Sequence, residues 1–120
     1  MTLKTVLGKI QDELQKREKV HEEVLKDMRR ATRLSKQAIL FTHQARFKEA
    51  KKLLKEATEL FGRLYSVAET YPDMLYSGMV NAAYQEYAEA RTFLVLVRDK
   101  FQRFLQLVFL EGVHVPWVDA

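Results

Sequence analysis

Apolar and small residues recur at alternating intervals of four and three along the first part of the chain, up to Thr42. This spacing predicts one face of a long amphipathic α-helix, interrupted only at Arg17 and His21. At about 1.5 Å per residue, such a helix is roughly 60 Å long. Because a small monomer cannot cover that length, we expect other helices, from this chain or from another copy, to lie along it. The face consists of Leu3, Leu7, Ile10, Leu14, Val24, Met28, Ala31, Ser35, Ala38 and Thr42.

The same periodicity predicts two further helices. A break at residues 43–46 precedes a second helix over about residues 47–69, with one apolar face and one lysine-rich face. The segment Tyr71-Pro72-Asp73 ends it, because the residue before a proline is disfavoured in a helix. A third helix, starting at Asp73 or at Ser77-Gly78, continues to about Leu110 and is apolar over most of its circumference. We therefore predict one all-α domain over residues 1–120, with three long antiparallel helices in a bundle that is completed by oligomerisation.

Composition supports this fold class and excludes several functions. Glycine and proline number only 4 and 2, which favours a few long helices over a sheet with many turns. The lack of cysteine excludes disulfides, thiolate metal sites and a thiol nucleophile. No signal peptide or membrane-spanning stretch is evident, so we expect a soluble cytoplasmic protein. The net charge of +4 permits binding to nucleic acid without demonstrating it.

A basic run on the first helix is the first candidate binding site. Arg29, Arg33 and Lys36 share one helical surface by their spacing, Lys26 lies one turn earlier, and Arg30 adds a further charge. Guanidinium groups pair well with phosphate oxygens, so the run suits a nucleic-acid backbone that is bound without sequence preference. The alternatives are a solvated helix face, or cations that serve as partners for buried glutamates.

Two acidic residues on the third helix are the second candidate site. Glu86 and Glu89 lie three residues apart, in line with the apolar positions Met79, Ala82 and Phe93. Carboxylates within an apolar stripe are costly unless a cation compensates them. That cation could be Arg or Lys from a neighbouring helix, or Mg²⁺ or Mn²⁺, which prefer oxygen ligands and can promote phosphodiester hydrolysis. An ordinary salt-bridge pair is the alternative to a metal site.

Histidine and tyrosine residues give weaker signals. The three histidines lie in separate segments without the spacing of a zinc site, and no nucleophile elbow or glycine-rich phosphate loop occurs. Tyr76 and Tyr84 could stack on bases if they are exposed. Aromatic residues at helical spacing are more often part of the core.

Three stretches of the sequence resemble the translin/Trax family, in particular its archaeal members. Residues 29–39, RRATRLSKQAI, resemble the basic signature of that family's first helix. Residues 71–78, YPDMLYSG, resemble the segment before its third helix. Residues 85–90, QEYAEA, are similar to the Q-E-Y-x-E-A motif of Trax-type proteins and are the most specific of the three. The likeness covers the whole chain but only the N-terminal half of the family's length.

The resemblance implies an all-α subunit of hollow oligomers, typically octamers, that enclose RNA or single-stranded DNA. Trax-type members are Mg²⁺-dependent endoribonucleases, and the motif places Glu86 and Glu89 as two of three catalytic acids. The third is an aspartate on a later helix, which Asp119 does not match. The resemblance thus implies binding of single-stranded RNA or DNA by Arg29, Arg30, Arg33 and Lys36, and leaves cleavage open. The alternative is a non-catalytic helical scaffold in which both glutamates form salt bridges.

Overall fold

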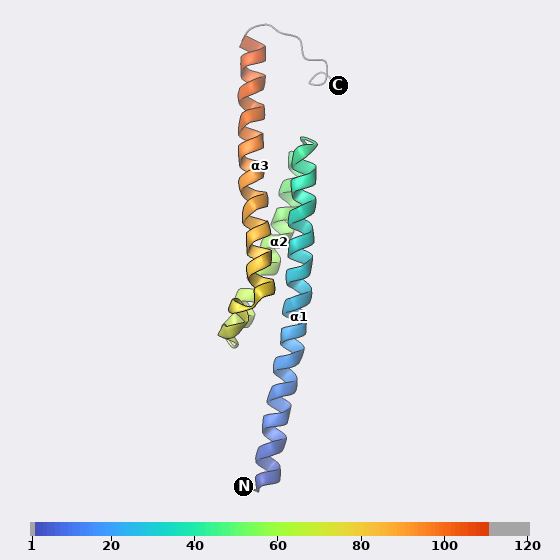
Figure 1. Ribbon diagram of the computed structural model, residues 1–120, viewed down its shortest axis with the longest axis vertical. Coiled ribbons are helices and arrows are strands. Elements are labelled where there is room, and N and C mark those ends of the chain that lie inside the picture. Colours follow the sequence, from blue (N-terminus) through green and yellow to red (C-terminus); the bar gives the residue numbers. More distant parts are fainter. Residues whose placement is uncertain (1, 111–120) are drawn as a thin grey trace.

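Three long helices and one short 3₁₀ helix make up the structure, a computed structural model that describes residues 2–110. They are α1 (Leu3–His43), α2 (Phe47–Ala68), the 3₁₀ helix η1 (Pro72–Tyr76) and α3 (Gly78–Leu110). Consecutive long helices are antiparallel, and α1 and α3 therefore run in the same direction (Figure 1). The predicted all-α architecture is confirmed. Asp119 lies outside the described residues.

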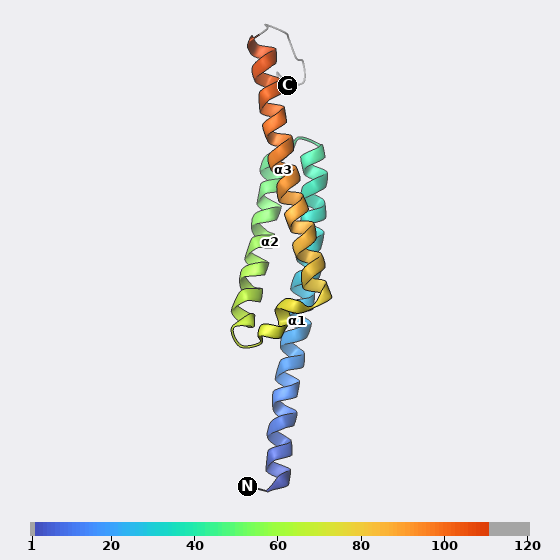
Figure 2. The ribbon, with the colours of Figure 1, turned by 60° about the vertical axis from the view of Figure 1, so that its left-hand side comes forward.

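The molecule is a rod, because the helices overlap over only part of their lengths. Its principal extents are 85 × 20 × 18 Å, and its radius of gyration is 21.9 Å, whereas a compact domain of this size has roughly 14 Å. The first turns of α1, residues 3–16, project beyond the other helices and form what we call the N-terminal arm (Figures 1 and 2). The last turns of α3 project at the opposite end. Long helical surfaces therefore lie outside the three-helix contact region.

Local interactions define the ends of α1. At its start, the Thr2 side chain accepts a hydrogen bond from the Thr5 backbone N–H, which is an N-cap. At its end, Ala45 adopts a left-handed conformation with φ of 58°. The Ala45 N–H donates to the Thr42 carbonyl, and the Arg46 N–H donates to the Phe41 carbonyl. These two bonds form a Schellman motif, so a helix end without glycine or proline still has a defined stop.

Small residues at the helix contacts let the three helices pack closely. Ala31 of α1, Ala57 of α2 and Ala83 and Ala90 of α3 are fully buried. Larger apolar side chains fill the space between them, and these buried residues are Val24, Met28, Leu34, Leu54, Leu60, Phe61, Leu64, Met74, Val80 and Leu94. The core therefore begins near Val24, and the apolar face of α1 before that position is left exposed.

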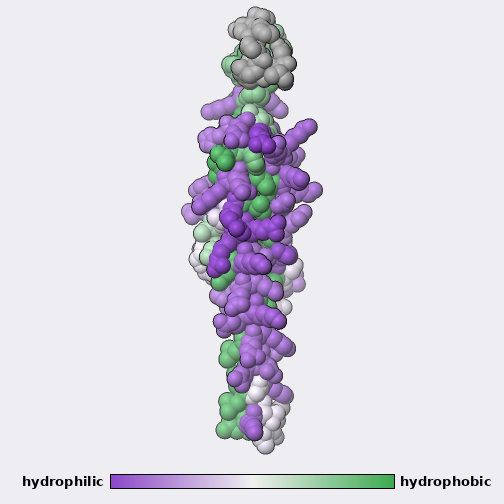
Figure 3. Space-filling model, turned by 90° about the vertical axis from the view of Figure 1, so that its right-hand side faces the viewer, coloured by the Kyte–Doolittle hydropathy of each residue, from purple (hydrophilic) through white to green (hydrophobic). Residues whose placement is uncertain are grey.

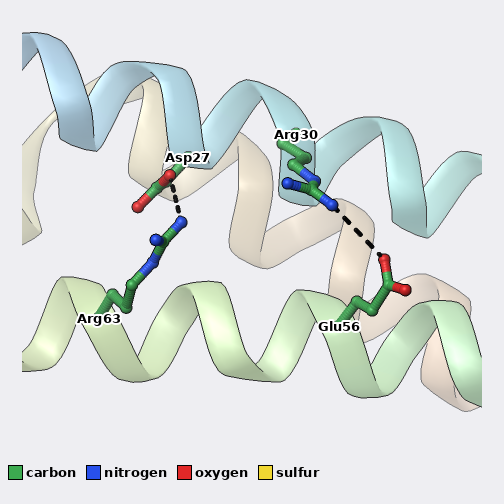
Figure 4. Close-up of polar contacts among 4 residues, drawn as sticks. All are labelled: Asp27, Arg30, Glu56 and Arg63. Atoms are coloured by element: carbon green, nitrogen blue, oxygen red, sulfur yellow. Dashed lines mark hydrogen bonds and ion pairs between the residues drawn. The ribbon is translucent and has the colours of Figure 1, made fainter.

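Ion pairs fix the register of α1 against α2. The Arg63 guanidinium lies 2.7 Å from the Asp27 carboxylate, and Arg30 lies 3.9 Å from Glu56 (Figure 4). Arg17, one of the polar positions on the apolar face of α1, pairs with Asp73 at the start of η1. Since most of these side chains are exposed, each pair contributes at most about 1 kcal/mol, and the apolar core supplies most of the stability.

Candidate nucleic-acid interface

Three of the four predicted phosphate-binding residues form one row on the solvent side of α1. Arg29, Arg33 and Lys36 are exposed and form no ion pair within residues 2–110. They lie on the side of α1 opposite to the buried positions Ala31 and Ser35, as the helical spacing predicts. We call these three residues the basic row.

Arg30 is the exception among the predicted phosphate contacts. It points toward α2, where its guanidinium faces Glu56 (Figure 4). A helical rotation of about 100° separates consecutive residues, which moves Arg30 off the surface that carries Arg29. Arg30 is therefore placed between α1 and α2, where it lines a hollow together with Arg33 of the basic row.

A shallow hollow adjoins the basic row where α1 meets α3. Its α1 side consists of Lys26, Arg29, Thr32 and Arg33, and its α3 side consists of the small or apolar residues Met79 and Ala82. None of these lining residues is acidic. The hollow therefore combines three cationic side chains with an apolar floor, a surface that suits the phosphates and the sugars or bases of a nucleic acid.

The two predicted acidic residues lie further along the same side of the molecule, on α3. Glu86 is half-buried and Glu89 is exposed. Neither carboxylate forms an ion pair or a side-chain hydrogen bond in the described part of the chain. No side-chain oxygen there is buried without a partner. Both carboxylates are therefore accessible to solvent at least in part, and within residues 2–110 no cation from another helix pairs with them.

Glu89 stands at the wall of a second, more apolar pocket between α1 and α3. Ile39 and His43 of α1 face Phe93 and Leu96 of α3 across it, and the ring centroids of His43 and Phe93 are 4.7 Å apart. Among residues 2–110, no group of three or more His, Cys, Asp or Glu side chains is arranged to hold a metal ion. The two glutamates thus offer carboxylate ligands without a third protein ligand from the described residues.

Tyr84 is partly buried at the edge of the core, so its ring is not available to stack on a base. Its ring stacks on Phe61 with centroids 4.5 Å apart, and its hydroxyl donates a hydrogen bond to the Tyr65 hydroxyl. Burial raises the pKa of the Tyr84 phenol above its ordinary value, and the hydrogen bond to Tyr65 raises it further. Tyr76, in contrast, is 82% exposed at the end of η1. Of the two tyrosines, only Tyr76 has a free face for stacking.

A polar network between α2 and α3 was not predicted from the sequence. The Tyr87 hydroxyl lies 2.6 Å from the Thr58 hydroxyl and accepts a hydrogen bond of 2.9 Å from the Arg91 guanidinium. The i, i+4 spacing of Tyr87 and Arg91 was the available signal. Thr58 belongs to another helix, so only the packing of α2 against α3 completes the network.

Comparison with known proteins leaves the function open. No family model matches the chain, and neither the curated proteins nor the solved structures include a significant match. No helix within residues 2–110 combines the length and the apolar character needed to cross a membrane. What the chain does is therefore inferred from its own side chains and from the resemblance of its motifs.

Proposed function

We propose that this chain is a self-associating helical subunit of the translin type that binds single-stranded RNA or DNA. The observation that carries the proposal is the basic row, three exposed cations without acidic partners in the described chain. Arg29 and Lys36 are seven residues apart, so the row is roughly 10 Å long. A row of that length faces a short run of consecutive phosphates, and the neighbouring hollow accommodates a sugar or base.

The chemistry of the basic row suits a phosphate backbone. The guanidinium groups of Arg29 and Arg33 can each form two parallel hydrogen bonds to one phosphate. Contacts of this kind release condensed counterions, so affinity must fall as salt concentration rises. Because contacts to phosphates carry no sequence information, we expect little sequence preference.

The binding proposal is tested by measuring affinity against salt. Fluorescence anisotropy with an oligo(U) strand of about 20 nucleotides should show a slope of log K against log salt of about −2 or steeper, since each of the three contacts of the basic row contributes about 0.7. Replacing Arg29 and Arg33 by Gln should weaken binding by roughly one to two orders of magnitude and reduce the slope by about 1.4. Replacing Lys48 and Lys52, two exposed α2 lysines at the same spacing of four, is the control and should change little. Salt-independent or absent binding contradicts the proposal.

Glu86 and Glu89 add a proposed metal-dependent activity, endoribonucleolytic cleavage as in Trax-type proteins. Their chemistry fits Mg²⁺ or Mn²⁺, because such ions are often held by one or two carboxylates and keep several waters. When bound, the ion would supply charge stabilisation to a phosphodiester under attack. The chain's own contribution is to hold two hydrated carboxylates on the side of the molecule that carries the basic row, where a bound strand would pass.

Metal binding can be measured without any activity. Paramagnetic Mn²⁺ should broaden NMR signals around Glu86 and Glu89 before those elsewhere, and replacing both by Gln should abolish this while thermal unfolding is unchanged. The matched control replaces Glu59 and Glu69, two exposed glutamates of the α2 region, by Gln. If Mn²⁺ has no localised effect and the double Gln variant instead alters the assembly, the chain is a non-catalytic scaffold.

A further inference from the structure

A second cationic groove runs between α2 and α3, apart from the basic row on α1. We call it the α2–α3 groove. It is lined by Lys51, Leu54, Lys55 and Thr58 of α2 and by Arg91, Leu94, Val95 and Arg98 of α3. Half of these residues are cations, two from each helix, and none is acidic. The charges therefore converge on one groove from both sides.

The four cations of the α2–α3 groove have no carboxylate partners. No ion pair within residues 2–110 involves Lys51, Lys55, Arg91 or Arg98. Glu59 lies four residues after Lys55 on α2, but the two side chains form no ion pair. The contact between α1 and α2 differs in this respect, because Asp27 pairs with Arg63 there and Glu56 pairs with Arg30 (Figure 4). Four like charges held together without partners favour an anionic ligand.

Hydrogen bonds orient one of these cations. The Arg91 guanidinium donates to the Tyr87 hydroxyl and lies 5.8 Å from the centre of the Tyr87 ring. The Tyr87 hydroxyl is in turn held by Thr58, whose own hydroxyl also bonds the Leu54 carbonyl. An arginine that is held by one acceptor retains free N–H groups for an anion and loses less side-chain entropy on binding.

We propose that the α2–α3 groove is a second phosphate-binding site for the same single-stranded nucleic acid. The groove lies on the side of α3 away from α1, so a strand that occupies both sites crosses the outer surface of α3. The exposed side chains Asn81, Gln85, Ala88 and Thr92 on that surface are small or uncharged, and they offer a strand a path on which Glu89, at the margin toward α1, is the nearest acidic residue. The inference rests on the proposed function, since it assigns a second contact to the same ligand.

The test compares two sets of variants in the full chain. Affinity for fluorescein-labelled oligo(U) of about 20 nucleotides is measured against salt for Lys55→Gln with Arg91→Gln. A second variant, Lys51→Gln with Lys55→Gln, leaves the Tyr87 network intact and so guards against a folding defect. We expect each to weaken binding by roughly tenfold or more and to lower the salt slope by about 1 to 1.5. The control is again Lys48→Gln with Lys52→Gln, which removes the same charge outside the groove lining.

The outcomes separate this inference from the proposed function. If both groove variants match the control while Arg29→Gln with Arg33→Gln loses affinity, the groove inference is overturned and the basic row stands. If only the groove variants lose affinity, the groove is the binding site and the role given to the basic row fails. If wild type does not bind the oligonucleotide, both fail. A loss in both sets, with unchanged thermal unfolding, supports both.

Discussion

Individual residues show how this chain places polar groups beside an apolar core. The hydroxyls of Ser35 and Thr42 are buried on α1, and each donates to the carbonyl four residues earlier, at 2.9 and 2.8 Å. Tyr84 is held differently, with its ring on Phe61 and its hydroxyl on Tyr65. In the described chain, buried side-chain polar atoms all have partners. The buried hydroxyl groups are therefore satisfied by hydrogen bonds within the protein, and the charged side chains stay at the surface.

The raised pKa of Tyr84 predicts a loss of stability at alkaline pH. Below its ordinary value of 10.0 the phenol is protonated in both states, and its contribution to stability is constant. Above that pH the unfolded chain loses the proton first, so stability falls until the pH passes the folded-state pKa. Urea unfolding from neutral pH to about pH 11 should show a larger loss for wild type than for Tyr84→Phe. At neutral pH the variant should lose about 1 kcal/mol or less. If the free energy of unfolding changed equally with pH in wild type and in Tyr84→Phe, the raised pKa of Tyr84 would be contradicted.

At the scale of the helices, the apolar face of α1 has two different environments. Its later part packs against α2 and α3, whereas Leu3, Leu7, Ile10 and Leu14 are each more than half exposed. Hydrophobic side chains reach the surface at this N-terminal end and again along the upper part of the molecule, between hydrophilic ones (Figure 3). The apolar spacing of α1 is therefore continuous, but its later part lies in the core and its first part lies at the surface.

The same substitution should have different effects in the two environments. Leu64 on α2 is 2% exposed, so Leu64→Ala should cost about 2–5 kcal/mol through lost burial and a cavity. Leu7→Ala on the arm should change the free energy of unfolding by no more than about 0.5 kcal/mol in dilute, monomeric protein. Urea unfolding of both variants measures this contrast. Equal losses would show that the arm packs against the bundle.

The whole molecule exposes large apolar side chains near both ends of the described chain. The arm residues Leu3, Leu7, Ile10 and Leu14 have the spacing 4-3-4, which reads the same in both directions. Two copies of the arm running antiparallel can therefore place Leu3 against Leu14 and Leu7 against Ile10 of the other copy. A two-fold axis makes such a contact self-complementary. This pairing gives the proposed self-association a specific surface.

Placing a charge in the arm stripe should weaken the assembly without unfolding the bundle. Leu14→Glu puts a carboxylate on the stripe, and Gln15→Glu puts one on the adjacent exposed position as a control. We expect Leu14→Glu to raise the dimer dissociation constant by at least about tenfold, since burying an unpaired charge is costly. Sedimentation equilibrium measures this, and circular dichroism checks that helicity is kept. If both variants assemble like wild type, the arm is not the contact.

The sequence by itself determined the helices. The four-three spacing defined α1, Pro72 marked the end of the second helix, and the scarcity of glycine and proline left few alternatives, although the spacing did not predict η1 or choose between Asp73 and Gly78 as the start of α3. It also placed Arg29, Arg33 and Lys36 on one surface, because residues three and four apart on a helix are neighbours whatever surrounds them. These properties are local, and a helix carries them without reference to the rest of the fold.

Only the tertiary structure decided which surfaces are used and which remain open. Periodicity could not show that α1 contacts its neighbours only from about Arg17 onward, since the spacing is the same before and after that point. It could not turn Arg30 toward Glu56, nor show that no Arg or Lys of the described residues forms an ion pair with Glu86. Likewise, the two lysines of α2 and the two arginines of α3 that meet in the α2–α3 groove are separated by about 40 residues in sequence. Such properties depend on contacts between distant segments, and only packing fixes those contacts.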